Sequence, residues 1–240
     1  MAADLDRAAR SRLRTLAKDN ADGVARHLVM AGRLLDDDPE AAYAHAQEAV
    51  RRAGRVDVVR EAAGITAYRT GRYAEALREL RTARRLSGSN EHVPLMADCE
   101  RGLGRPERAL ALAEEHAGLL TPAVQIELAI VVSGARLDLE QPDAALGVLS
   151  TPAMRLLSGP VGWRVAEARA TALRACGRIA EADAVLAGIP DEAFGDEEPV
   201  VVTDLEAFGD EEPVLVTDLD DPADPADVCD SAPAHGEETS

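Results

Sequence analysis

Apolar residues along most of this 240-residue chain recur at helical spacing. The clearest stretch covers residues 63–86, AGITAYRTGRYAEALRELRTARRL, and predicts two helices joined by a tight turn at Gly71. We expect Gly64 where the two helices approach closely, with Ala76 and Ala83 on the inner face of the second helix. One such hairpin cannot bury its apolar face alone, so the pattern predicts neighbours of the same kind.

Similar helical segments precede and follow this hairpin, and proline after Asp38 and after Thr121 marks two helix starts. The predicted hairpins cover about 22–53, 57–87, 91–117, 121–150 and 160–190. An alanine follows each turn, namely Ala42, Ala76, Ala109, Ala145 and Ala182, at spacings of 34, 33, 36 and 37 residues. This period predicts an all-α protein whose residues 21–190 form an α-solenoid of about five antiparallel helix-turn-helix repeats.

These hairpins resemble tetratricopeptide repeats. The matching residues are Gly64, Gly71, Tyr73, Ala76, Leu77, Ala83 and Leu86 in the second hairpin, Ala97, Gly104, Ala109 and Leu110 in the third, and Ala170, Gly177 and Ala182 in the fifth. The first and fourth hairpins depart from the pattern, because Asp37 and Glu140 replace the turn glycine. Two segments, RHLVMAGRLL and MADCERGLGRPERALALAEEH, also resemble bacterial tetratricopeptide-repeat proteins of unassigned role.

The N-terminal residues 1–20 predict an amphipathic helix over 4–18 that caps the repeat domain. Its apolar side would carry Leu5, Ala9, Leu13 and Leu16, and its other side Arg7, Arg10, Arg14 and Lys18. The basic side is either a solvated outer face or a docking surface.

The C-terminal residues 191–240 predict a disordered acidic tail, because they combine 18 acidic residues with proline and no basic residue. A 14-residue unit occurs twice in tandem, at 192–205 and 206–219, with 13 identical positions. Phe194 and Phe208, the only phenylalanines of the chain, occupy the same place in each copy. The duplication is either gene slippage without a role or a bivalent binding motif that adds a strand to a partner sheet.

Composition narrows the classes of partner. All 26 basic residues lie in residues 1–190 beside 26 of the 44 acidic ones, so the net charge of −18 belongs to the tail. A neutral body with few aromatic residues disfavours nucleic acid. The chain has no signal-peptide pattern and no apolar run long enough for a membrane span, and its three cysteines are far apart. We therefore expect a cytoplasmic protein without a membrane partner.

No motif for catalysis or for a cofactor stands out. The five histidines, His27, His45, His92, His116 and His235, lack the spacing of metal ligands, and no phosphate-binding loop or nucleophile elbow occurs. Cys99 and Cys176 fall on first-helix positions and are expected to be buried. The sequence thus predicts a non-enzymatic protein without metal or cofactor, and an enzyme that uses a cysteine in a site not visible in the sequence stays open.

The resemblance implies that the first helix of each hairpin lines a concave protein-binding groove. The corresponding residues are His27, Glu61, Ile65, Tyr68, Asp98, Arg101, Glu127, Arg164, Glu167 and Arg174. The leading hypothesis is a scaffold or adaptor that binds a protein segment in this groove, modulated by weak contacts between the tail and arginines of the body. The alternative is a regulatory protein whose acidic tail itself binds a basic partner.

Overall fold

A computed structural model describes residues 1–190, and these residues form helices without any strand. The α-helices are α1 (Arg7–Arg12), α2 (Lys18–Arg33), α3 (Pro39–Ala53), α4 (Asp57–Arg69), α5 (Tyr73–Ser87), α6 (Val93–Gly102), α7 (Pro106–His116), α8 (Pro122–Asp138), α9 (Pro142–Val148), α10 (Pro152–Arg155), α11 (Gly159–Ala175) and α12 (Ile179–Leu186). Three short 3-10 helices complete the list: η1 (Ala2–Asp4), η2 (Leu13–Thr15) and η3 (Ala117–Leu119).

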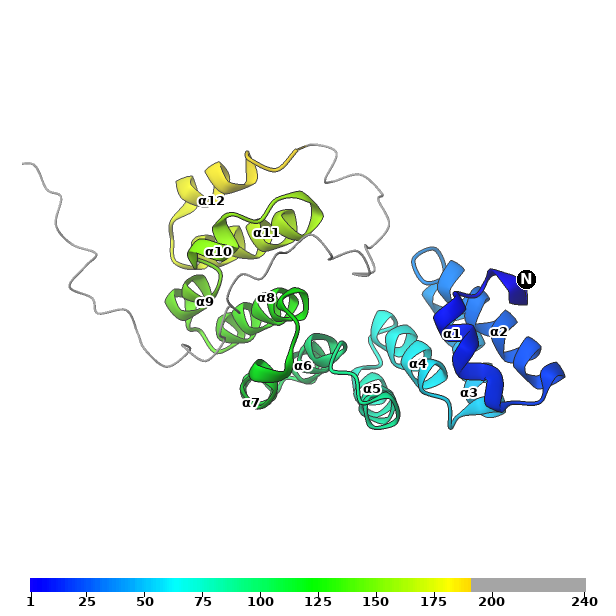
Figure 1. Ribbon diagram of the computed structural model, residues 1–240. Coiled ribbons are helices and arrows are strands. Elements are labelled where there is room, and N and C mark those ends of the chain that lie inside the picture. Colours follow the sequence, from blue (N-terminus) through cyan, green and yellow to red (C-terminus); the bar gives the residue numbers. More distant parts are fainter. Residues whose placement is uncertain (191–240) are drawn as a thin grey trace, which may run out of the picture.

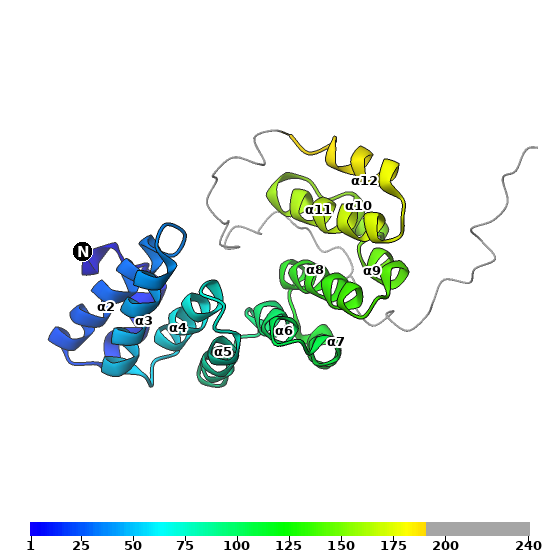
Figure 2. The same ribbon diagram turned by 180° about the vertical axis from the view of Figure 1, so that it is seen from behind.

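The helices pack in adjacent pairs, α2 with α3, α4 with α5, α6 with α7, α8 with α9 and α11 with α12. Successive pairs touch, since α3 packs on α4, α5 on α6 and α7 on α8. The pairs follow one another along a curved row, with α1–α3 at one end and α11 and α12 at the other (Figures 1 and 2). The predicted all-helical class and the helix pairs are therefore present in the described residues.

The same turn joins the helices of four pairs. In each turn, one residue has a positive φ, and its amide donates to the carbonyl three residues earlier. The amide of the following residue donates to the carbonyl five residues before it. These two hydrogen bonds close the last turn of the first helix. The positive-φ residues are Gly71, Gly104, Glu140 and Gly177. In the α2–α3 turn, by contrast, Asp37 has no positive φ, and Asp38 caps α3 by accepting from the Ala41 amide at 3.0 Å.

Small residues bring the paired helices together. The five turn-following alanines are each the fourth residue of the second helix of a pair, and none is more than 1% exposed. In the α4–α5 pair, a Cβ on Gly64 would lie 2.6 Å from the Leu80 side chain, so the predicted close approach at Gly64 is confirmed. Alanine, leucine and valine fill most of the core in the near absence of large aromatic residues.

The N-terminal segment does not form the single predicted helix over 4–18. It is divided into η1, α1 and η2, and α2 begins at Lys18, inside the segment predicted as a cap. The predicted apolar side is nevertheless used, since Leu13 is 2% exposed and Leu5 and Leu16 pack against the same cluster. An ion pair between Arg12 of α1 and Asp57, the first residue of α4, joins the N-terminal segment to the helix pairs. The segment thus lies against both α2 and α4.

A second departure is the short helix α10 between α9 and α11, where Thr151 caps the helix by accepting from the Met154 amide at 3.3 Å. It lengthens the connection and accounts for the wide spacing between Ala145 and Ala182. Within residues 1–190, no helix has the length and apolar character needed to cross a bilayer. The predictions about the acidic tail, its disorder, the tandem unit, Phe194 and Phe208, lie outside the described residues.

Candidate protein-binding surface

The ten predicted groove residues all lie on the first helices of the pairs. These helices are partly in contact with one another, α2 with α4, α6 with α8 and α8 with α11. We call the surface formed by α2, α4, α6, α8 and α11 the first-helix face. Its centre is polar, and one end carries an apolar hollow.

Three of the predicted residues form one polar network at the centre of this face. The Tyr68 hydroxyl of α4 donates to Asp98 of α6, and Asp98 also accepts from Arg101 Nη1 at 2.7 Å. Arg101 Nε in turn donates to Asp138 of α8 at 2.8 Å. Gly134 makes room for this arginine, because a Cβ there would lie 2.5 Å from Arg101 Cζ. The network therefore ties three successive pairs together.

Burial and neighbouring carboxylates set the ionisation of this network. Burial, followed by the Asp98 carboxylate, raises the pKa of Tyr68. Burial alone would lower the pKa of Arg101, but Asp138 and Asp98 together raise it. The tyrosine is thus held as a neutral donor and the arginine as a cation around neutral pH.

Two further pairs of side chains connect neighbouring elements. Arg164 of α11 binds Glu127 of α8 through two parallel hydrogen bonds, at 2.6 and 2.5 Å. Because Arg164 is about half exposed, this pair is worth only ~0–1 kcal/mol. His92, just before α6, lies 3.2 Å from Glu61 of α4. Burial would lower the pKa of His92, but the hydrogen bond and charge of Glu61 raise it.

An apolar hollow of about 220 Å³ lies at the α2–α4 end of the first-helix face. It is lined by Leu5, Ala9, Leu28, Ala31, Gly32, Leu35, Val58, Glu61, Ala62, Ile65 and Thr66. Two predicted residues, Glu61 and Ile65, thus face the N-terminal segment. Leu5 and Ala9 were missed as members of this surface, and the signal that could have placed them was the apolar side of the segment they belong to.

Three predicted residues take no part in these contacts between first helices. His27 faces His45 of its own pair, with the two Nδ1 atoms 3.0 Å apart, and burial and then His45 lower the pKa of His27. Arg174 pairs with Asp183 of α12 at 3.1 Å. Glu167 is exposed, and its carboxylate has no polar partner within residues 1–190. The predicted set therefore divides into a connected group and three separate residues.

The two cysteines of the described region are poorly suited to nucleophilic chemistry. Cys99 is fully buried in α6, and burial, then the charges of Asp98 and Glu100, raise its pKa to about 12. Cys176 Sγ lies 3.7 Å from Asp143 Oδ1, and burial and this carboxylate raise the pKa of Cys176. The reactive form of cysteine is the thiolate, so both thiols are held in the unreactive form at neutral pH.

Other arginines of the body form ion pairs with nearby carboxylates. Arg51 and Arg52 bind Glu48, and Arg81 binds the buried Glu100 at 3.0 Å. Residues 1–190 contain no group of three or more histidines, cysteines and carboxylates arranged to hold a metal ion.

Comparison with known proteins returns no matching family model, no matching curated protein and no matching solved structure.

Proposed function

We propose that this chain is a non-enzymatic adaptor, a tetratricopeptide-like α-solenoid of five repeats that binds an extended or helical segment of a partner protein on its first-helix face. The observation that carries the proposal is the apolar hollow around Ile65, which shares the first-helix face with the polar network of Tyr68, Asp98 and Arg101. An apolar pocket with a few fixed polar groups is the usual composition of a recognition site.

In this proposal, an apolar side chain of the partner enters the hollow between Leu28, Val58 and Ile65. The polar network then fixes the register of the segment, since carboxylate oxygens of Asp98 and Asp138 can accept further hydrogen bonds from it. Tyr68 and Arg101 are already ordered by their own contacts. Binding therefore loses little side-chain entropy there, which favours affinity.

The test uses the full chain and a displayed library of random peptides as the probe. We expect selected peptides to share one apolar anchor, and Ile65→Glu to weaken their binding at least tenfold, which corresponds to about 1.4 kcal/mol. The matched control is Ile179→Glu, because Ile179 is 51% exposed on α12, away from this face. If both variants bind alike, or if no peptide is selected, the proposal is wrong.

One double variant separates recognition of the peptide from stability of the fold. Arg164→Glu combined with Glu127→Arg keeps the ion pair between α11 and α8 but reverses its polarity. We expect this exchange to preserve the melting temperature and to change the charge pattern of the selected peptides. Unchanged peptides would show that Glu127 and Arg164 only hold the helices together, and they would remove the α8–α11 part of the face from the binding surface.

A further inference from the structure

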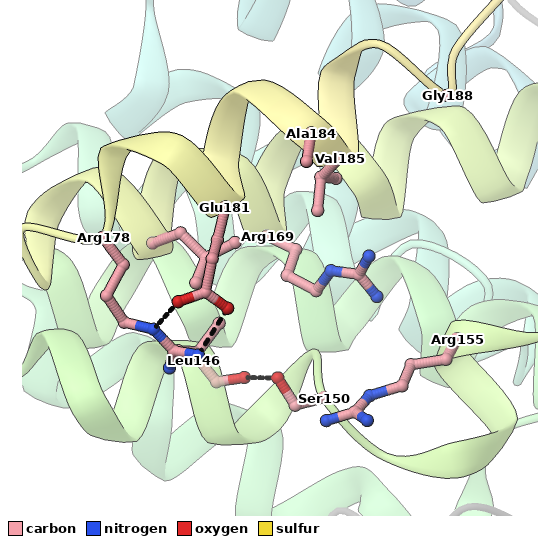
Figure 3. A pocket seen from close by; sticks show the side chains of 10 residues that line it. Leu146, Ser150, Arg155, Arg169, Arg178, Glu181, Ala184, Val185 and Gly188 are labelled. Carbon is pink, nitrogen blue, oxygen red and sulfur yellow. Dashed lines mark hydrogen bonds and ion pairs between the residues drawn. The ribbon is translucent and has the colours of Figure 1, made fainter. Parts of the chain in front are cut away.

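A larger hollow, of about 650 Å³, lies away from the first-helix face, at the far end of the curved row. Residues of α9, α10, α11 and α12 and their connections surround it (Figure 3). Its lining is Leu146, Ser150, Arg155, Arg169, Leu173, Arg178, Glu181, Ala184, Val185 and Gly188. The lining thus combines apolar side chains with three arginines and a single carboxylate.

Two of these arginines are left with uncompensated charge. Arg178 is neutralised by Glu181 through two hydrogen bonds of 2.7 Å. The guanidinium groups of Arg155 and Arg169 make no hydrogen bond or ion pair within residues 1–190, and Figure 3 shows no bond from either group to the other residues drawn. The hollow therefore offers two free cations beside the apolar Leu146, Leu173 and Val185. This surface fits a segment that carries one apolar anchor between carboxylates.

The tail of the same chain has that composition. Each tandem copy reads EAFGDEE, so that Phe194 and Phe208 are preceded by one carboxylate and followed by three. The tail holds no basic residue that could neutralise these charges internally. It also starts close by, because Gly188 lines the hollow and Phe194 follows six residues later, within a reach of about 20 Å.

We propose that the acidic tail docks in this hollow, with the phenylalanine of one copy against Leu146, Leu173 and Val185 and its carboxylates on Arg155 and Arg169. The contact is independent of the function proposed for the first-helix face. One hollow serves two equivalent copies, so the duplication raises the local concentration of the motif without any new contact. The surface thereby recognises an acidic segment with a phenylalanine anchor, and the tail is its resident occupant.

A rival basic surface exists at the other end of the row. Arg10, Arg14 and Lys18 border a hollow of the N-terminal segment. Arg10 is already engaged there, because its guanidinium donates to the carbonyls of Ala3 and Leu5. Asp22 also borders that hollow and offsets part of its charge. The chain connection favours the hollow at α9–α12, and the experiment includes the rival as a control.

The experiment uses fluorine-labelled phenylalanine, incorporated into the full chain during expression. Phe194 and Phe208 are the only phenylalanines, so every ¹⁹F signal reports on the tail. At low salt, we expect both signals to be shifted and broadened relative to those of Arg155→Glu/Arg169→Glu. Raising the salt to about 1 M, where the Debye length is near 3 Å, should convert the wild-type spectrum into that of the variant.

The matched control is Arg14→Glu/Lys18→Glu, which changes the net charge equally but lies at the rival surface. We expect it to keep the wild-type spectrum. Arg155→Gln/Arg169→Gln, which removes the cations without adding repulsion, should abolish the shift as the charge reversal does, and circular dichroism verifies that each variant is folded. Identical spectra for the wild type and the α9–α12 variants would overturn the proposal. So would a loss of the shift in the control, or a shift that disappears on dilution, which would indicate docking between two copies.

Discussion

Glu140 is the only residue other than glycine, within residues 1–190, that has a positive φ, at 58°. It occupies the turn position that Gly71, Gly104 and Gly177 hold in other pairs. A side chain with a Cβ is strained by about 1–2 kcal/mol in this left-handed conformation. Glycine relieves that strain but loses about 0.5–1 kcal/mol more chain entropy on folding.

We therefore expect Glu140→Gly to raise the free energy of unfolding by about 0.5–1 kcal/mol. The measurement is urea denaturation followed by circular dichroism. Asp37→Gly is the matched control, because Asp37 occupies the corresponding position of the α2–α3 turn without a positive φ. We expect Asp37→Gly not to raise the free energy of unfolding. If both variants change stability equally, the effect comes from the unfolded chain and not from strain at Glu140.

Two histidine contacts between elements make stability depend on pH in opposite directions. His27 of α2 faces His45 of α3, and burial and His45 lower the pKa of His27, so protonation favours the unfolded chain. This contribution is present above the unfolded pKa of about 6.5 and is lost as the pH falls through the folded pKa of His27. His92 is the opposite case, because Glu61 raises its pKa. Its contribution is present below about 6.5 and is lost as the pH rises through its folded pKa.

We expect His27→Gln to reduce the loss of stability between about pH 7.5 and 5.5, and His92→Gln to increase it. Each effect should stay under about 1 kcal/mol, because the side chains are not fully buried and solvent screens such contacts. The measurement is the urea midpoint of the wild type and of both variants across this pH range. The three proteins share their carboxylates, so the effect of these groups on stability cancels when the pH profiles are subtracted. Parallel pH profiles for all three proteins would contradict the assignment.

The sequence predicts the helix pairs well because local signals mark their ends. Gly71 lies in the turn between α4 and α5, Asp38 caps α3 and Pro122 begins α8, and the predicted hairpin at 57–87 coincides with α4 and α5. The sequence does not predict the interruptions of helices that depend on tertiary contacts. The segment 4–18 has a continuous helical pattern, yet it is divided where Leu13 turns into the core, and α10 occupies a connection that carries only the Thr151–Pro152 start signal.

The candidate surface could be predicted only in part. All ten predicted residues lie on the first helices of the pairs, because the position of a residue within a hairpin fixes which helix carries it. That position does not give the partner of each side chain. Tyr68 meets Asp98 across 30 residues, and Glu127 meets Arg164 across 37. Such contacts depend on how successive pairs rotate against each other, and no local pattern in the sequence encodes that rotation.

At the scale of the whole molecule, the row of pairs implies that stability is local. Leu13 is 2% exposed in a cluster with residues of α2, α3 and α4, whereas the fully buried Leu149 belongs to a cluster of α8, α10 and α11. Each cluster involves only neighbouring elements. In the repeat array that we propose, stability is approximately a sum of the repeat stabilities and the interfaces between neighbours.

Leu13→Ala should therefore cost about 2–5 kcal/mol at its own end of the row, through lost burial and the cavity that remains. Hydrogen exchange followed by mass spectrometry should show faster exchange in α2–α4 and unchanged exchange in α11 and α12. Leu149→Ala, the matched substitution, should produce the reverse pattern, with loss of protection in α8–α11 and none in α2 and α3. If either substitution accelerates exchange uniformly over residues 1–190, the body unfolds as one cooperative unit. A repeat array with independent ends would then be the wrong description of this chain.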